Sequence, residues 1–228
     1  MGAAGEAERL AFLQQTPPWA RAEPAVLRLL ARGSLFVRVA ALAPVFLQGD
    51  VPRDVYVVRS GAIVLTLQSV DGRLLALDEL RPGACFGELG ALTGRARSAC
   101  AEARVDSELL AIEARAFAAA IKADAALTQG LLVLTAERLQ DTAEREVALA
   151  FMDADARVAR LLLHLDRLYE EVGYITISQA ELGQWTGLSR QTVAGILGRW
   201  RRRGWLTTGR GRIVLFDYQR LAAVSQRF

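Results

Sequence analysis

The sequence contains few of the side chains that bind metals or form disulfides. Its 228 residues include two cysteines, Cys85 and Cys100, and one histidine, His164. Two cysteines cannot build a disulfide framework, which is typical of a protein in a reducing cytosol. With a single histidine they cannot supply the four Cys and His ligands of a usual zinc or iron–sulfur site. We therefore expect no bound metal.

Long uncharged apolar runs are also missing. Apolar residues make up 52% of the chain, yet no stretch of eighteen residues is free of charge, so we expect no membrane-spanning helix. The N-terminus carries Glu6 and Glu8 and no basic cluster, which argues against a secretory signal. This composition predicts a globular, cytoplasmic protein that does not act at a membrane.

The net charge of +3 hides a difference between the two ends of the chain. Residues 154–228 contain 12 arginines and 6 acidic residues, whereas residues 1–153 contain 16 basic and 19 acidic residues. A basic rear half favours binding to a polyanion, and the acidic front half is typical of a sensor or assembly domain. A merely solubilising basic surface is the alternative.

Prolines divide residues 6–32 into short helical pieces, and a different pattern runs from Leu35 to about Leu110. There, short apolar runs such as 55–58 and 74–77 are separated by turn sequences such as Asp71-Gly72. Asp-Gly between two apolar runs is a strong signal for a β-hairpin. This spacing of strands predicts a small antiparallel barrel or sandwich.

From about Glu113 onward the pattern is helical. One set of positions repeats at steps of three and four residues, as in a coiled coil: Leu132, Thr135, Leu139, Thr142, Glu146 and Leu149. A long helix with this seam predicts pairing with another helix, although two of the positions are polar. Packing of the stripe against the protein's own barrel is the alternative.

The segment 177–200 divides into a helix, a turn and a second helix. Gly187 permits the turn, and Ser189 can cap the second helix. At its start, Arg190 can donate two hydrogen bonds to guanine, and Gln191 can pair with adenine. Gly195 and Gly198 each cost the helix about 1 kcal/mol relative to alanine, which close approach to a DNA groove would explain. An ordinary helical hairpin is the alternative.

Two apolar runs follow, 205–208 and 213–216, and they flank Gly209-Arg210-Gly211-Arg212. This pattern predicts a hairpin with arginines at its tip, which suits contact with phosphates. More arginines, at positions 199 and 201–203, lie at the end of the second helix. Asp153 can cap a helix from Ala154 to about Tyr169, so the short segment before it is a natural hinge.

A segment in the front half, 86–99, combines glycines, a carboxylate, a guanidinium and a hydroxyl. Gly87 and Gly90 permit a tight turn into a short helix whose free N–H groups can face an anion. Arg97 and Ser98 suit one phosphate, whereas Glu88, which only accepts hydrogen bonds, suits a ribose hydroxyl. The combination predicts a nucleotide with one negative charge.

Together these motifs resemble the cyclic-AMP receptor protein (catabolite activator) or Crp-Fnr family of bacterial transcription regulators, over about residues 25–217. The resemblance implies an α+β protein with an antiparallel, jelly-roll-like β-roll, a long dimerisation helix and a winged helix-turn-helix. The expected ligand is cyclic AMP or cyclic GMP, which controls the placement of the DNA-binding domains. The expected partners are a second copy of the chain, double-stranded DNA with a palindromic operator, and RNA polymerase.

The resemblance also assigns domains and residues. The domains are 1–112 for the N-terminal helices and β-roll, 113–150 for the helical segment, 151–153 for the hinge and 154–228 for the DNA-binding domain. Arg138 would pair with Glu88, Thr142 would touch the base, and Ala143 would face the partner's pocket. The expected ligand-binding set is Leu77, Asp78, Phe86, Gly87, Glu88, Leu89, Arg97, Ser98, Ala99, Arg138, Thr142 and Ala143. The expected DNA-binding set is Ser178, Gln179, Ser189, Arg190, Gln191, Thr192, Gly195, Arg199, Arg210 and Arg212.

The chain departs from the family pattern near the base. Asp78 stands where the cyclic-AMP receptor has a small hydroxyl residue, and its carboxylate can accept two N–H donors from guanine, which keeps cyclic GMP open. An Asp78 side chain that points to solvent is the alternative. Ala143 lacks the hydroxyl that helps to recognise adenine. Gln191 and Gly195 replace an acidic residue and an arginine, so we expect a different operator. The loop from Glu88 to Arg97 is one residue shorter.

Two other functions compete with this interpretation. The same fold could respond to a redox or thiol signal through Cys85 and Cys100, or act without a nucleotide. An enzyme is not expected, because no metal cluster or general-base histidine lies near Glu88 in the sequence.

Overall fold

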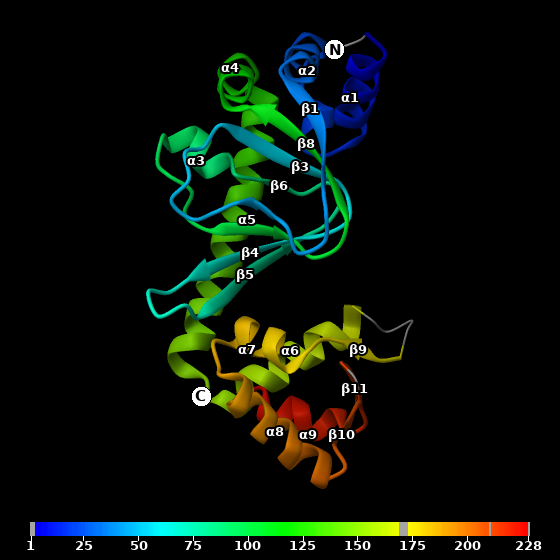
Figure 1. Cartoon of the computed structure of the whole chain (residues 1–228), viewed down its shortest axis with the longest axis vertical. Coiled ribbons are helices and arrows are strands. Elements are labelled where there is room, and N and C mark those ends of the chain that lie inside the picture. The colour runs from blue at the N-terminus through cyan, green and yellow to red at the C-terminus, as the bar shows by residue number, and fades with distance from the viewer. Residues whose placement is uncertain (1–2, 169–172, 210, 228) are drawn as a thin grey trace. The chain divides into compact units, whose positions relative to one another are not determined.

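The computed structural model describes residues 3–168, 173–209 and 211–227 (Figure 1). The chain divides into two compact units. One consists of residues 1–68 and 76–139, and the other consists of residues 69–75 and 140–228.

The first unit begins with helices that cover an apolar core. These are α1 (Ala3–Gln15), the 3-10 helix η1 (Trp19–Arg21) and α2 (Pro24–Arg32). Pro24 occupies the first turn of α2, where a missing N–H costs nothing. Trp19 and Leu30 are fully buried and pack with Phe117 and Leu127 from later helices.

Two four-stranded antiparallel sheets form a β-roll, as the spacing of the apolar runs predicts. The first sheet has the order β1-β8-β3-β6, with β1 (Ser34–Val39), β8 (Ser107–Glu113), β3 (Asp54–Ser60) and β6 (Cys85–Phe86). The second has the order β2-β7-β4-β5, with β2 (Pro44–Phe46), β7 (Cys100–Ala103), β4 (Ile63–Gln68) and β5 (Leu74–Leu80). Buried residues of both sheets, such as Val58, Ile63 and Phe86, share one core. Gly72, at φ +78°, lies in the Asp-Gly turn between β4 and β5.

Helix α3 (Glu88–Thr93) lies between β6 and β7, and α4 (Ala114–Ala123) and α5 (Ala125–Phe151) follow the last strand of the roll, β8. Asp124 caps α5, because its Oδ1 accepts a hydrogen bond from the backbone N–H of Leu127 at 2.9 Å. The inward face of α5 buries Leu127 and Leu131. All six positions of the coiled-coil stripe are exposed, and Leu132 and Leu139 are 66% and 70% accessible. The stripe therefore does not pack on the protein's own roll.

The second unit is a helix-turn-helix with a small sheet. It contains α6 (Ala154–Leu168), α7 (Gln179–Thr186), α8 (Arg190–Arg202) and α9 (Tyr218–Val224), and a sheet of order β10-β11-β9, with β10 (Leu206–Gly209), β11 (Arg212–Leu215) and β9 (Ile175–Thr176). Asp153 caps α6 as predicted, since its Oδ1 accepts from the N–H of Ala156 at 2.7 Å. The predicted turn is present, with Gly187 at φ +67°. The sequence pattern does not indicate the short elements β9 and α9.

Candidate functional site

The segment 86–99, here called the cassette, begins where β6 turns into α3. Gly87 adopts φ +80°, a left-handed conformation that favours glycine, and it immediately precedes α3. A Cβ at this position would lie 2.6 Å from Nη1 of Arg97. Both the backbone conformation and the close approach of Arg97 therefore require glycine here.

Arg97 is buried beside this turn. Its side chain is only 5% exposed, Nη1 donates to the carbonyl of Gly87 at 2.6 Å, and Nη2 donates to the carbonyl of Asp54 at 2.6 Å. The centre of the guanidinium lies 4.2 Å from the centroid of the Phe46 ring. The Nε atom is buried and has no hydrogen-bond partner among the described residues.

The charge of Arg97 has no ion-pair partner in the part of the chain that the structure describes, although acidic side chains lie farther away. Burial therefore lowers the pKa of the Arg97 guanidinium, and nearby Tyr56 and Asp54 offset this only in part. A buried cation with only neutral acceptors is costly. An anion bound beside Arg97 would remove that cost, so the donor set fits a phosphate group.

Glu88 is the buried carboxylate of the cassette. It is 6% exposed, and its Oε1 accepts a hydrogen bond from Nη1 of Arg138 on α5 at 2.9 Å. Arg138 also donates to the carbonyl of Cys85. The structure thus brings together the two residues that the resemblance pairs, and Arg138 fixes the orientation of a carboxylate that suits a sugar hydroxyl.

The other expected residues of the cassette differ in the solvent exposure of their side chains. Ser98 is exposed next to Arg97, and Leu89 is 50% exposed on α3. Phe86 is fully buried and stacks on Tyr56 at 5.2 Å between ring centroids, and Ala99 is also buried. The side chains of Phe86 and Ala99 therefore anchor the cassette in the core, and mainly the backbone atoms of these residues remain available to a ligand.

Strand β5 places Asp78 on the inner face of its sheet. Its neighbours on that face, Ala76 and Leu80, are 4% and 3% exposed, and Asp78 is half-buried between them. Because strand side chains alternate, Leu77 and Glu79 lie on the opposite face. This alternation favours an inward Asp78 side chain over the solvent-facing alternative.

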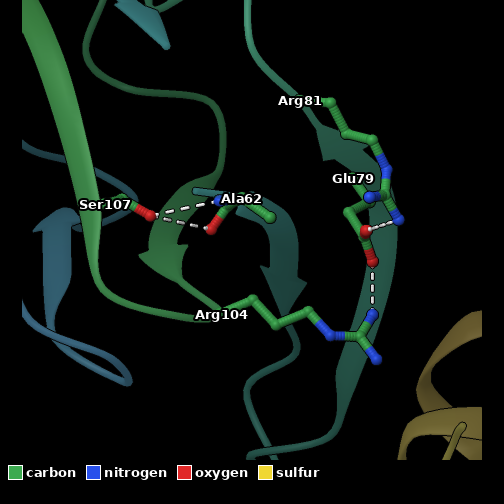
Figure 2. A network of polar contacts seen from close by, with 5 residues as sticks. All are labelled: Ala62, Glu79, Arg81, Arg104 and Ser107. Carbon is green, nitrogen blue, oxygen red and sulfur yellow. Dashed lines mark hydrogen bonds and ion pairs between the residues drawn. The ribbon is translucent and has the colours of Figure 1, made fainter. Parts of the chain in front are cut away.

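Ion pairs hold the opposite face of β5, as Figure 2 shows. The Glu79 carboxylate accepts from Arg81 at 2.7 Å and pairs with Arg104, which follows β7. In the same view, the Oγ of Ser107 accepts from the backbone N–H of Ala62 at 3.1 Å. These contacts tie β5 and the start of β4 to the segment between β7 and β8.

Thr142 and Ala143 lie about one helical turn beyond Arg138 on α5. Both are exposed. They extend the surface of the same continuous helix that carries the exposed stripe.

The start of α8 presents polar side chains to solvent. Arg190, Gln191 and Thr192 are exposed, and the Oγ of Ser189 caps the helix by accepting from the N–H of Thr192 at 3.0 Å. A Cβ at Gly195 would come no closer than 4.0 Å to its nearest neighbour, the tip of Arg199. Nothing in the described protein therefore explains this glycine by packing.

Three of the remaining expected DNA-binding residues, Ser178, Arg199 and Arg212, have partners within the domain. Ser178 caps α7 in a capping box with Glu181, and Gln179 begins that helix. Arg199 donates to both carboxylate oxygens of Asp155 at 2.7 Å, and Arg212 stacks on Tyr174 at 4.5 Å. Arg210 lies outside the described residues.

Comparison with known proteins identifies two domains. A cyclic nucleotide-binding domain matches residues 26–124, and a Crp-like helix-turn-helix domain matches residues 156–224. The cyclic AMP receptor protein of Thermus thermophilus is 34% identical over 171 residues, which cover 75% of this chain and 78% of that protein. The chain belongs to the Crp-Fnr family of transcription regulators.

Two further Crp-Fnr relatives agree with this assignment. The cAMP-activated global transcriptional regulator CRP of Pasteurella multocida is 32% identical over 65% of this chain and 74% of its own length. A solved CRP-family transcriptional regulator, also from Thermus thermophilus, is 28% identical, with a TM-score of 0.69 over 83% of this chain and 96% of that one. The domains and relatives are those of transcription regulators and not of enzymes, as the sequence predicts.

The two cysteines of this Crp-Fnr protein lie in different environments. Cys85 is buried, and burial raises the pKa of its thiol well above the usual value, which disfavours the reactive thiolate. The Sγ of Cys100 accepts a hydrogen bond from the backbone N–H of Gln48 at 3.3 Å. Within residues 3–168, 173–209 and 211–227, no three His, Cys, Asp or Glu side chains are grouped to hold a metal ion.

No single helix among the described residues is long and apolar enough to cross a membrane. Helices α4 and α5 meet that criterion only when taken together, across a bend of 112°.

Sequence reasoning misses the residues that surround Arg97. Phe46, Asp54 and Tyr56 belong to strands 41 to 51 residues earlier in the chain, and the sequence indicates them only as part of the strand pattern. An aromatic residue at the end of a strand carries no local signal that it will meet a particular arginine.

Proposed function

We propose that this protein is a homodimeric transcription regulator whose DNA binding is controlled by cyclic AMP or cyclic GMP. The observation that carries the proposal is the buried guanidinium of Arg97, which lies in a cyclic nucleotide-binding domain without an ion-pair partner among the described residues. Two relatives, one named a cAMP-activated regulator and the other a cyclic AMP receptor protein, support the choice of ligand class.

The residues of the cassette have distinct roles in this proposal. Arg97 and Ser98 donate to the cyclic phosphate, beside the backbone of Gly87. Glu88 accepts from the ribose 2′-hydroxyl, and Arg138 holds the Glu88 carboxylate in orientation. Further along α5, Thr142 contacts the base and Ala143 faces the ligand of the partner protomer. Leu89 on α3 adds apolar contact, whereas the side chain of Leu77 lies on the other face of β5 from Asp78.

The exposed stripe of α5 supports the homodimer. Leu132 and Leu139 are large apolar side chains at coiled-coil spacing, and both are mostly exposed in the single chain. Pairing with the same stripe of a second copy buries them, as in a two-stranded coiled coil. A twofold dimer then presents two copies of α8 to a palindromic operator in the cytoplasm, where RNA polymerase is the further partner.

Isothermal titration of the purified protein with cyclic AMP and with cyclic GMP tests the proposal. We expect saturable binding of at least one nucleotide, with one ligand per protomer, and tighter binding of an operator fragment in its presence. Nucleoside 5′-monophosphates, which lack the cyclic phosphate, serve as the control. Absence of binding by both cyclic nucleotides would contradict the proposal, and a regulator without a nucleotide ligand would then take its place.

The inward position of Asp78 leads to a prediction about base choice. Replacing Asp78 by serine is expected to weaken cyclic GMP more than cyclic AMP, because the carboxylate accepts from the adjacent N–H groups of guanine and finds fewer donors on adenine. Loss of a hydrogen bond to a charged acceptor corresponds to about 1.5–3 kcal/mol, or roughly 10- to 150-fold in affinity. The ratio of the two dissociation constants, measured by titration, checks this.

Glu102→Ser is a suitable control for that substitution. Glu102 is an exposed carboxylate on strand β7 of the same sheet, which β4 separates from β5, and it has no role in the proposed site. Equal losses for both nucleotides in Asp78→Ser, or no loss for either, would show that Asp78 takes no part in selecting the base.

A further inference from the structure

The backbone of Arg97 is held by the turn that follows β2. The N–H of Arg97 donates to the carbonyl of Asp50, and the N–H of Gly49 donates to the carbonyl of Arg97, both at 2.9 Å. The turn is closed by its own contacts, since Oδ2 of Asp50 accepts from the N–H of Leu47 at 2.8 Å. The turn therefore fixes the backbone position from which the Arg97 side chain extends.

The same segment also supplies the surface on which the side chain lies. Phe46, the last residue of β2, places its ring centroid 4.2 Å from Cζ of Arg97. The Phe46 ring is itself fixed, because its centroid lies 5.9 Å from those of Tyr56 and Phe86. Phe46 is only half-buried, so the contact lies at the margin of the core.

An aromatic ring attracts a guanidinium without neutralising it. The N–H donors of arginine lie in the plane of the group, so a ring against its face leaves the edges available for hydrogen bonds. Two of these donors bond to the carbonyls of Gly87 and Asp54. The ring and the two carbonyls together fix the plane of the group, and hence the direction of its remaining N–H donors.

We infer that Phe46 is a positioning residue for nucleotide binding, which holds the plane of the Arg97 guanidinium in the orientation that receives the phosphate. The inference rests on the proposed function, because it requires that Arg97 binds the phosphate. It assigns a role in ligand affinity to a residue outside the Phe-Gly-Glu-Leu and Arg-Ser-Ala segments of the cassette.

The test compares Phe46→Leu with a matched control elsewhere in the same unit. Phe36, on β1, is also half-buried and has the guanidinium of Arg59 over its ring, again at 4.2 Å. Phe36→Leu therefore removes the same kind of contact at the same distance, away from the cassette. Affinities for cyclic AMP and cyclic GMP are measured by titration on the 228-residue chain, and circular dichroism establishes that each variant is folded.

We expect Phe46→Leu to lower the affinity for the nucleotide about 3- to 30-fold, which corresponds to the range of cation–π interaction energies. Phe36→Leu should leave the affinity within about twofold of the original value. Phe46→Tyr retains a ring, so it should retain most of the affinity. In an Arg97→Lys background the planar group is absent, and Phe46→Leu should then add less than about a twofold loss.

The outcomes separate the two claims. If Arg97→Lys and Arg97→Ala weaken binding but Phe46→Leu does not, the role of Phe46 is wrong and the proposed function stands. An equal loss of affinity in Phe36→Leu also overturns the role of Phe46. So does a loss in Phe46→Tyr as large as that in Phe46→Leu, because the effect would then be one of general packing. If neither Arg97 variant changes binding, the phosphate assignment fails, and the inference fails with it.

Discussion

Arg97→Ala should lower the affinity for cyclic nucleotide by about 10- to 150-fold. The expected loss follows from removing a charge-assisted contact, which contributes about 1.5–3 kcal/mol. Arg97 is the buried cation of the cassette, so no exposed neighbour can take its place without moving into the core. Titration with cyclic AMP and cyclic GMP measures the effect, and at modest ligand concentration binding should disappear.

The fold, and with it the proposed dimer, should survive this substitution. Alanine removes a buried charge whose pKa is lowered by burial, and this gain opposes the loss of hydrogen bonds to the carbonyls of Gly87 and Asp54. Arg95→Ala is the matched control, because Arg95 is exposed two residues earlier in the same loop. Similar isotherms for the original protein and Arg97→Ala would remove the phosphate assignment.

Glu88→Ala should have a comparable effect for a different reason. It removes the acceptor for the ribose hydroxyl and also the carboxylate that pairs with Arg138 at 2.9 Å. Glu88→Gln retains the shape of the side chain but not its charge, so it separates the contribution of the hydrogen-bond acceptor from that of the ion pair with Arg138. A 2′-deoxy cyclic nucleotide should bind the original protein more weakly, and it should be affected less by Glu88→Ala.

Arg190→Ala should weaken binding to the specific operator by about 1–3 kcal/mol, or roughly 5- to 150-fold, and relax the preference for guanine at one position. Arg190 is exposed in the first turn of α8, where it can reach the edge of a base. Fluorescence anisotropy with operator variants, at one fixed salt concentration, measures both changes.

Arg220→Ala controls for the loss of one positive charge. Arg220 is an exposed arginine of α9 and is not part of the recognition helix. An equal loss in both variants, without any change in base preference, would reduce the role of Arg190 to that of a general cation. Footprinting should show two half-sites about 10 base pairs apart, roughly 34 Å, and a single asymmetric site would contradict the dimer.

The parts of the fold that the sequence predicts well depend on neighbours along the chain. Asp153 and Ser189 cap the helices that follow them, and Gly187 makes the turn between α7 and α8. In each case the side chain or the glycine acts within about three residues. Such local interactions can be predicted from the sequence, because the residue and its partner are only a few positions apart.

Contacts between strands of the roll cannot be predicted in this way. The partners of Arg97 include Asp54, which is 43 residues away, and the ring of Phe46. The pairing of Glu79 with Arg104 joins residues 25 apart. These contacts depend on the order of strands in the sheets and on their register, which the apolar pattern of one strand does not determine.

Under the proposed function, the burial of Arg97 also links the amount of nucleotide to the lifetime of the protein. A ligand that binds only the folded state stabilises it by an amount that grows with the logarithm of its concentration, about 2.7 kcal/mol at a hundred times the dissociation constant. The ligand-free roll bears the desolvation cost of a guanidinium, and an anion relieves it. Since proteolysis acts on opened molecules, a fall in nucleotide would silence the regulator and also hasten its removal.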